Sequence, residues 1–225
     1  MKYLVATRAR VGGFLSVCAR ALLCGAILMF ACVAAPAAKP PAALDQYQRT
    51  SWDSKDGAPG GVWAIAQTSD GWLWFGGPTG LHRFDGIRFT RMALEPADST
   101  RSEHVSALFA TDAGQLLIGR YNGGVSVFDA GQFRHYPDES KTAATVLAFA
   151  LDADGVPWAG TRTGMVRFDG KSWRRATADW NLPEARFESV LLDRAGTLWV
   201  STPTEVMQLT RGARRFEQDH IKVVG

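Results

Sequence analysis

The feature that most constrains the fold of this chain is an internal repeat with a period of 41 to 43 residues. Its most regular members are four glycines, Gly71, Gly114, Gly155 and Gly196, spaced 43, 41 and 41 residues apart. An apolar residue stands nine positions before each glycine (Val62, Val105, Val146 and Phe187), and another stands six positions before it (Ile65, Leu108, Phe149 and Val190). Self-similarity at such a period indicates stacked units that bury a continuous core between neighbours.

Each unit carries the signals of short antiparallel strands. A short segment containing aspartate leads into each of the four glycines. This composition indicates a turn, because glycine supplies a positive φ and the aspartate side chain bonds its own backbone. Three positions later stands a large apolar residue: Trp74, Leu117, Trp158 or Trp199. The first three units close on Phe84-Asp85, Phe128-Asp129 and Phe168-Asp169, whereas the fourth keeps only the first half of the pattern. Four short strands in about 41 residues are typical of a propeller blade.

The repeat predicts an all-β fold, a β-propeller with four blades of four antiparallel strands. We expect the blades at about 62–101, 105–142, 146–183 and 187–219, within a propeller region over 62–225. Residues 38–61 would form a linker and a lead-in strand. If the ring does not close, two apolar blade faces are left in water.

The first 37 residues predict a helical secretory signal peptide. Residues 1–20 carry four basic and no acidic side chains, and an apolar stretch from Ala21 to Ala35 follows. Ala35-Pro36-Ala37 supplies a small-residue cleavage site. The stretch is short for a membrane span, which needs about 20 residues, and an uncleaved anchor is the alternative. We therefore expect a periplasmic or otherwise extracytoplasmic mature chain.

The composition of the mature part excludes several classes of function. The whole chain has 25 basic and 22 acidic side chains, but four of the basic ones lie in the leader and the rest is close to neutral. This balance predicts no nucleic-acid partner. Cys18, Cys24 and Cys32 also lie in the leader, so no disulfide or thiolate metal site is expected. The histidines, expected at the surface or rim, have no ligand spacing, and we predict no metal, no cofactor and no catalytic residue.

The stretch from Val62 to Gly86 resembles the two-component regulator propeller repeat, and Tyr47 to Trp52 with Asp56-Gly57 resembles the segment that commonly precedes the first such repeat. The resemblance implies a periplasmic sensor whose propellers usually have seven blades, followed by a β-sandwich, a membrane span and a histidine kinase or diguanylate cyclase. The four blades would then be an incomplete part of a seven-bladed propeller. Their partners would be missing downstream blades and signalling domains of a longer parent. Membrane contact would come only through the N-terminal segment or a missing downstream span.

Ligand contacts are expected in the loops that differ between blades, because a rigid scaffold carries its variable chemistry there. The links between the second and third strands should share a face with the connections between blades. The candidate ligand-binding residues in these links are Arg120, Tyr121, Asn122 and Arg162. Arginine offers a planar fork for carboxylates, and tyrosine offers a flat face for sugars. The alternative is that these are ordinary solvated loop residues.

These observations predict an extracytoplasmic ligand-sensing propeller segment of a two-component signal transduction protein, non-catalytic in itself. Its ligand would be an unknown small molecule or oligosaccharide. Two alternatives remain open at this point. One is an autonomous secreted four-bladed propeller that binds a protein or a glycan, and the other is an exported propeller lyase or hydrolase.

Overall fold

The computed structural model describes residues 49–94, 103–136 and 144–219 of the chain. The chain divides into two compact units, Met1–Thr50 and Ser51–Gly225. The predicted leader over residues 1–37 lies outside the described residues. In the described part of the second unit, the strands form four sheets, and each sheet contains four strands that follow one another in sequence order.

The four sheets are blades 1 to 4. Blade 1 contains β1 (Ala64–Gln67), β2 (Leu73–Gly77), β3 (Gly80–Phe84) and β4 (Phe89–Met92), and blade 2 contains β5 (Val105–Ala110), β6 (Leu116–Arg120), β7 (Val125–Asp129) and β8 (Gln132–Tyr136). Blade 3 contains β9 (Val146–Leu151), β10 (Pro157–Thr161), β11 (Gly164–Phe168) and β12 (Trp173–Ala176), and blade 4 contains β13 (Ser189–Leu192), β14 (Leu198–Ser201), β15 (Val206–Leu209) and β16 (Glu217–Gln218). Two short 3-10 helices, η2 (Ser54–Asp56) and η3 (Ala178–Trp180), precede blades 1 and 4. All pairings are antiparallel, which confirms the predicted all-β fold of four four-stranded blades.

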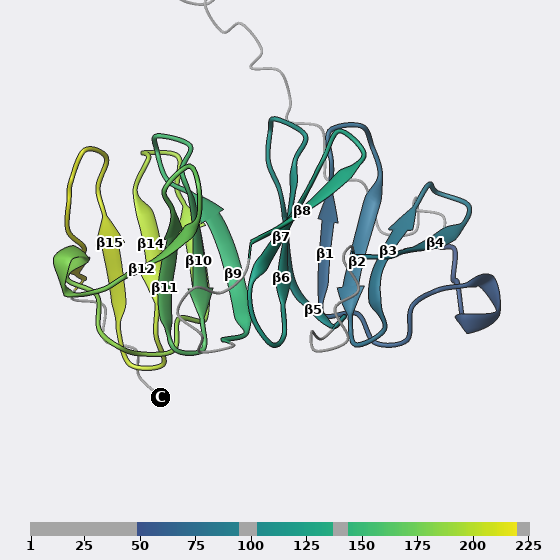
Figure 1. Ribbon diagram of the computed structural model, residues 1–225, viewed down its shortest axis with the longest axis horizontal. Coiled ribbons are helices and arrows are strands. Elements are labelled where there is room, and N and C mark those ends of the chain that lie inside the picture. The colour runs from purple at the N-terminus through teal and green to yellow at the C-terminus, as the bar shows by residue number, and fades with distance from the viewer. Residues whose placement is uncertain (1–48, 95–102, 137–143, 220–225) are drawn as a thin grey trace, which may run out of the picture. The chain divides into compact units, whose positions relative to one another are not determined.

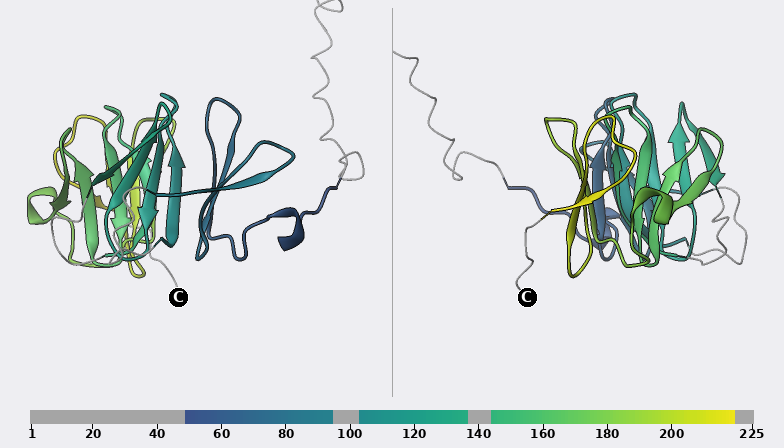
Figure 2. Two further views of the ribbon diagram at one scale, coloured as in Figure 1. Left: turned by 45° about the vertical axis from the view of Figure 1, so that its right-hand side comes forward. Right: turned by 90° about the vertical axis from the view of Figure 1, so that its left-hand side faces the viewer.

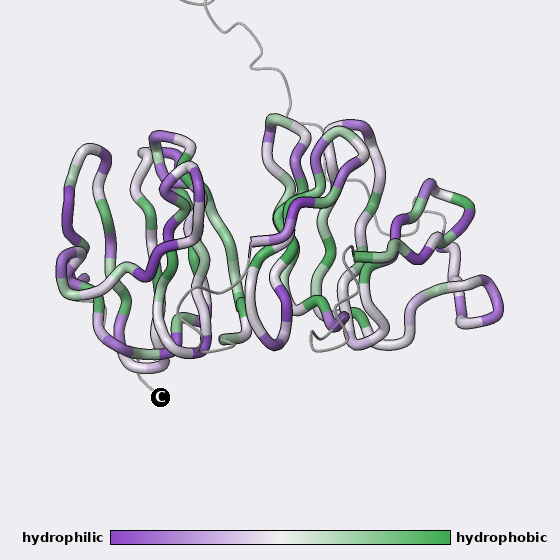
Figure 3. Tube along the Cα trace, viewed as in Figure 1, coloured by the Kyte–Doolittle hydropathy of each residue, from purple (hydrophilic) through white to green (hydrophobic). Residues whose placement is uncertain are grey.

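Successive blades pack against one another through their first strands. β1 contacts β5, β5 contacts β9, and β9 contacts β13, so the blades stand in chain order, as Figure 1 shows, and Figure 2 gives the same ribbon turned about the vertical axis. Apolar residues lie along the strands, and hydrophilic residues collect at the turns (Figure 3). The core therefore lies in the layers between blades, as the repeat predicts.

A glycine lies at each of these junctions, five positions after the turn glycine of its blade. A Cβ added to Gly76 of blade 1 would lie only 2.4 Å from Val105 Cγ1 of blade 2. A Cβ on Gly119 would lie 2.7 Å from Val146, and a Cβ on Gly160 would lie 2.9 Å from the backbone oxygen and 3.2 Å from the Cβ of Phe187. The three residues that approach these glycines occupy one position of the repeat. The same close contact between blades is therefore made three times.

The tryptophans that follow the turn glycines lie beside the junctions. Trp74 and Trp158 are buried, with 1% and 0% of their surfaces exposed, and Trp199 of the last blade is half-buried. Each indole N–H donates to a turn residue six positions earlier: Trp158 to Asp152 at 2.9 Å, Trp199 to Asp193 at 2.8 Å and Trp74 to Thr68 at 2.9 Å. A buried indole needs such an acceptor. The shared contact confirms the predicted repeat register.

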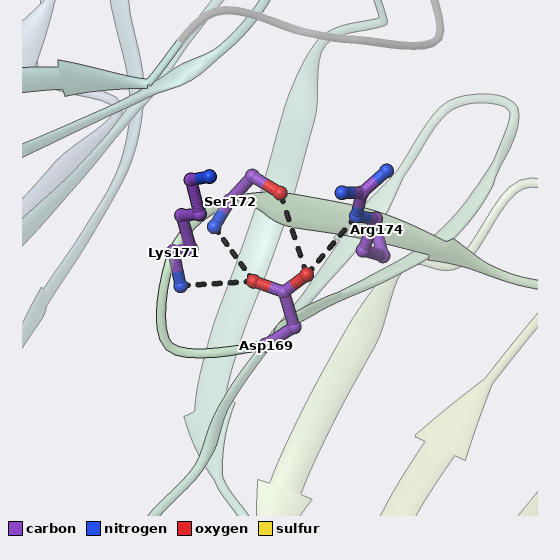
Figure 4. Close-up of polar contacts among 4 residues, drawn as sticks. All are labelled: Asp169, Lys171, Ser172 and Arg174. Atoms are coloured by element: carbon purple, nitrogen blue, oxygen red, sulfur yellow. Dashed lines mark hydrogen bonds and ion pairs between the residues drawn. The ribbon is translucent and has the colours of Figure 1, made fainter.

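Aspartate carboxylates close several of the turns, among them Asp85 and Asp169 between the third and fourth strands of blades 1 and 3 and Asp193 between the first and second strands of blade 4. The carboxylate of Asp169 accepts the backbone N–H groups of Ser172 at 2.7 Å and Lys171 at 2.8 Å, and Arg174 Nε at 3.0 Å (Figure 4). These bonds, the one from Ser172 foremost, hold the pKa of Asp169 far below its usual value. In blade 4, the indole N–H of Trp199, followed by the backbone N–H of Thr197, lowers the pKa of Asp193. Both folded carboxyls therefore favour the ionised form.

Substitution of Gly119 by alanine tests the close contact between blades 2 and 3. Overpacking costs about 1–3 kcal/mol, which exceeds the roughly 0.4–1 kcal/mol that alanine gains by restricting the unfolded chain. We expect Gly119→Ala to lower the free energy of unfolding measured in urea. Gly60→Ala is the matched control, because nothing lies within 4 Å of a Cβ at Gly60. Equal stability of the two variants would show that the blades are not in such close contact.

The aspartate turns predict a loss of stability in acid. The pKa of an unfolded aspartate is about 3.9, so a group with a lower folded pKa stabilises the fold above about pH 4 and loses this contribution as the pH falls toward its folded pKa. The melting temperature, followed by circular dichroism, should fall below about pH 4, and Asp169→Asn should weaken this dependence. Asp179→Asn, which removes an exposed carboxyl outside the turns, should keep it. Identical pH profiles for both variants would contradict the account.

Candidate functional site

The links between second and third strands lie beside the segments that lead into the blades. Tyr121 follows β6, and its N–H donates to the carbonyl of His104 at 3.0 Å, directly before β5. Arg162 follows β10, and its N–H donates to the carbonyl of Thr145 at 3.1 Å, directly before β9. The links therefore lie beside His104 and Thr145, the described ends of the connections that enter blades 2 and 3. Tyr121 and Arg162 occupy the same repeat position in neighbouring blades, where blades 1 and 4 have Pro78 and Pro203.

Four side chains from three blades come together on this face. The ring centroid of Trp63, just before β1, lies 6.2 Å from that of His104 and 5.8 Å from that of Tyr121. The rings of His104 and Tyr121 lie 6.1 Å apart. The guanidinium carbon of Arg162 lies 5.6 Å from the centre of the Tyr121 ring. We call Trp63, His104, Tyr121 and Arg162 the aromatic cluster.

The aromatic cluster presents flat rings and one cation to solvent. Half of the Trp63 surface is exposed, His104 and Arg162 are exposed, and Tyr121 is half-buried. The ion pairs within the described residues do not include Arg162. Aromatic rings offer stacking surface to a sugar or another flat group, and a guanidinium offers a planar fork to a carboxylate. The arrangement suits a ligand that combines a flat apolar face with a negative charge.

The structure separates the four candidates predicted from the sequence. It brings Tyr121 and Arg162 together and leaves Asn122 exposed on the same link. Arg120 is only 3% exposed, and its Nε donates to Ser126 Oγ at 3.3 Å, inside blade 2. Arg120 is therefore not on the exposed surface of the link. Ligand binding by any of these residues stays a prediction.

Sequence reasoning missed Trp63 and His104. Trp63 stands eight positions before its turn glycine, where the other blades have Ser106, Leu147 and Glu188. A large aromatic residue at a position that the repeat does not fill with a core residue was the available signal. His104 gave no comparable signal, because only the fold brings its ring close to those of Trp63 and Tyr121.

The histidines do not all lie where the sequence predicted. The expectation that the histidines lie at the surface is wrong for His82, which is 8% exposed, and burial followed by the charge of Arg91 lowers its pKa. Ser126 Oγ lies 3.1 Å from His135 Nδ1, but Ser126 is 1% exposed and is enclosed in blade 2. Within residues 49–94, 103–136 and 144–219, no three His, Cys, Asp or Glu side chains are placed to hold a metal ion. Nor does any helix in that part have the length and apolarity to cross a membrane.

Comparison with known proteins places the chain among the propellers. Residues 56–79 match the family model described as two component regulator propeller. The extracellular domain of BT4673 from B. thetaiotaomicron, assigned to a hybrid two component system, superposes with a TM-score of 0.61 at 20% identity over 71% of this chain and 23% of that chain. The extracellular domain of BT3049 from the same organism superposes with a TM-score of 0.56 at 16% identity, over 70% of this chain and 24% of that chain. Virginiamycin B lyase from Staphylococcus aureus superposes with a TM-score of 0.57 at 14% identity, over 70% of this chain and 55% of that chain. No curated protein matches the sequence.

The match and the fold together define the class of this protein. It is a β-propeller chain that carries a two-component regulator propeller repeat, as the resemblance of Val62 to Gly86 predicted. It spans about a quarter of the length of the BT4673 and BT3049 domains that it superposes on. Those two domains share its fold at 16 to 20% identity, and virginiamycin B lyase, an enzyme, shares it at 14%.

Proposed function

We propose that this chain is an extracytoplasmic ligand-sensing segment of a two-component signal transduction protein, and that it catalyses no reaction itself. Kinase or cyclase output would come from other parts of a longer parent. The regulator propeller match at residues 56–79 and the fold shared with extracellular domains of hybrid two component systems support this role. The aromatic cluster is the observation that carries the proposal, because it offers an exposed, chemically defined contact surface built from three blades.

The ligand would be an oligosaccharide or another small molecule with a carboxylate. Trp63 and Tyr121 would stack on its flat face, and Arg162 would pair with its negative charge. The two contacts come from different blades. A bound ligand would therefore bridge neighbouring blades, and binding would be transmitted through the contacts between them.

Calorimetric titration with digalacturonate and with its neutral analogue digalactose tests this proposal. We expect the charged disaccharide to bind more tightly and Trp63→Ala to weaken its binding about tenfold, roughly 1.4 kcal/mol. Arg162→Met should remove the preference for the charged sugar while leaving the neutral one unchanged. Trp52→Ala and Arg194→Met are the matched controls, since both side chains are exposed elsewhere in the described structure. Binding that none of the cluster variants weakens would place the ligand on another face.

A further inference from the structure

A small cleft opens between blades 2 and 3, the two middle blades of the chain. Its volume is about 210 Å³, which is less than the roughly 300–1,000 Å³ of sites that hold drug-sized ligands. Pro157, at the start of β10, lines the cleft, whereas Arg162 of the aromatic cluster follows the other end of that strand. No residue that lines the cleft belongs to the aromatic cluster. The cleft is therefore a separate candidate site for a small ligand.

The room in the cleft comes from the absence of a tryptophan. Leu117 lines the cleft and stands three positions after its turn glycine, where the other three blades have tryptophan. The equivalent Trp74 fills the junction between blades 1 and 2, where its ring centroid lies 5.0 Å from that of Phe128. Leucine is smaller than tryptophan, so the junction between blades 2 and 3 keeps an opening at this place.

The wall that blade 2 contributes to the cleft carries one charge of each sign. Val127 on β7 lies opposite Leu117 on β6 and opposite Arg134 on β8. Asp129 lies two residues further along β7 than Val127. Because side chains alternate between the two faces of a sheet, these four side chains share the face that looks onto blade 3.

The carboxylate and the guanidinium on this wall do not form an ion pair in the described structure. In blade 3, the equivalent Asp169 and Arg174 lie 3.0 Å apart as an ion pair. In blade 2, the Asp129 carboxylate instead accepts a hydrogen bond from Gln115 Nε2 at 2.9 Å. Arg134 is exposed, and the ion pairs within the described residues do not include it. A ligand that carries both an ammonium and a carboxylate group would complement both side chains.

The remaining walls are aromatic and include an unsatisfied donor. The ring of Phe168 in blade 3 lies 5.2 Å from that of Tyr136 in blade 2 and 5.5 Å from that of Trp173. Trp173 is 6% exposed, and its indole N–H is buried without an acceptor among the described residues. Blades 1 and 2 have phenylalanine at this repeat position. A buried donor without a partner is costly, so an acceptor on a ligand would be favoured beside it.

We propose that this cleft is a second binding site, and that its ligand is an aromatic α-amino acid with a hydroxyl group, such as tyrosine. The ammonium group of the ligand pairs with Asp129, and its carboxylate pairs with Arg134. Its ring packs against Tyr136 and Phe168. Its hydroxyl oxygen accepts the indole N–H of Trp173. The ligand therefore meets a complementary group at each of its ends and an apolar wall between them.

Equilibrium dialysis of the whole chain against radiolabelled L-tyrosine tests the proposal. Three competitors each lack one recognised group: phenylalanine lacks the hydroxyl, tyramine lacks the carboxylate, and desaminotyrosine lacks the ammonium. Each should compete at least about tenfold more weakly than unlabelled tyrosine, because each leaves one buried or charged partner in the cleft unsatisfied. Absence of saturable tyrosine binding, or equal competition by all three analogues, would overturn the proposal.

Three substitutions should remove these preferences one at a time. Arg134→Met should abolish the preference for tyrosine over tyramine, and Asp129→Asn should abolish the preference over desaminotyrosine. Trp173→Phe, which introduces the residue that blades 1 and 2 already have, should abolish the preference over phenylalanine. Arg194→Met and Asp179→Asn are the matched controls, since both side chains are exposed outside the cleft, and they should keep all three preferences. Preferences that none of the three cleft substitutions changes would overturn the proposal.

Leu117→Trp gives the sharpest result, because it restores the residue of the other blades and fills the cleft. Its indole N–H has an acceptor in Thr111, which stands six positions earlier, as Thr68 stands before Trp74. The variant should melt cooperatively and lose tyrosine binding, and a variant that melts cooperatively but still binds tyrosine would overturn the proposal. Trp63→Ala, in the aromatic cluster, should leave tyrosine binding unchanged, so a failure of the proposed function is distinguishable from a failure of this site. Loss of tyrosine binding in Trp63→Ala would instead place the amino acid at the aromatic cluster.

Discussion

The close approach of each blade to the glycine of the blade before it is the contact on which the rest of the structure depends. Gly76, Gly119 and Gly160 leave room for an apolar side chain where any Cβ would clash. This approach lets the first strands of neighbouring blades pack together and encloses Trp74 and Trp158. A single blade could not bury its faces, since repeat units gain their core from their neighbours. The aromatic cluster exists only because three blades are held at this spacing.

The fold was largely predictable because its determinants recur at a fixed period. The turn glycines and the apolar residues before them give the strand register directly, and the structure places Val105, Val146 and Phe187 in equivalent buried contacts. The indole acceptors were also encoded in the sequence. An oxygen acceptor stands six positions before each of these tryptophans: a carboxylate in Asp152 and Asp193, and a hydroxyl in Thr68.

The candidate site was predictable only in part, because its four members do not all share one repeat position. Tyr121 and Arg162 were found as departures of the link from its neighbours. Trp63 belongs to a different position of the repeat, and only the spacing between blades brings it within 5.8 Å of Tyr121. Arg120 is the reverse case, a residue that was predicted for the site but does not lie on its exposed surface. A charged residue in a loop is usually solvated, but Arg120 is the last residue of β6, is buried, and donates from Nε to the hydroxyl of Ser126 inside the blade.

The most direct test of the central claim is a double-mutant cycle between Gly119 and Val146, measured as free energies of unfolding in urea. If the two residues meet across the junction, Gly119→Ala should destabilise the native protein but cost little once Val146→Gly has removed both Val146 Cβ and its methyl groups, because a Cβ at position 119 would lie 2.7 Å from Val146 Cβ and from Val146 Cγ1. The account predicts a coupling energy of about 1 kcal/mol or more between the two changes. Effects that add to within about 0.5 kcal/mol would contradict it, because residues without contact behave independently.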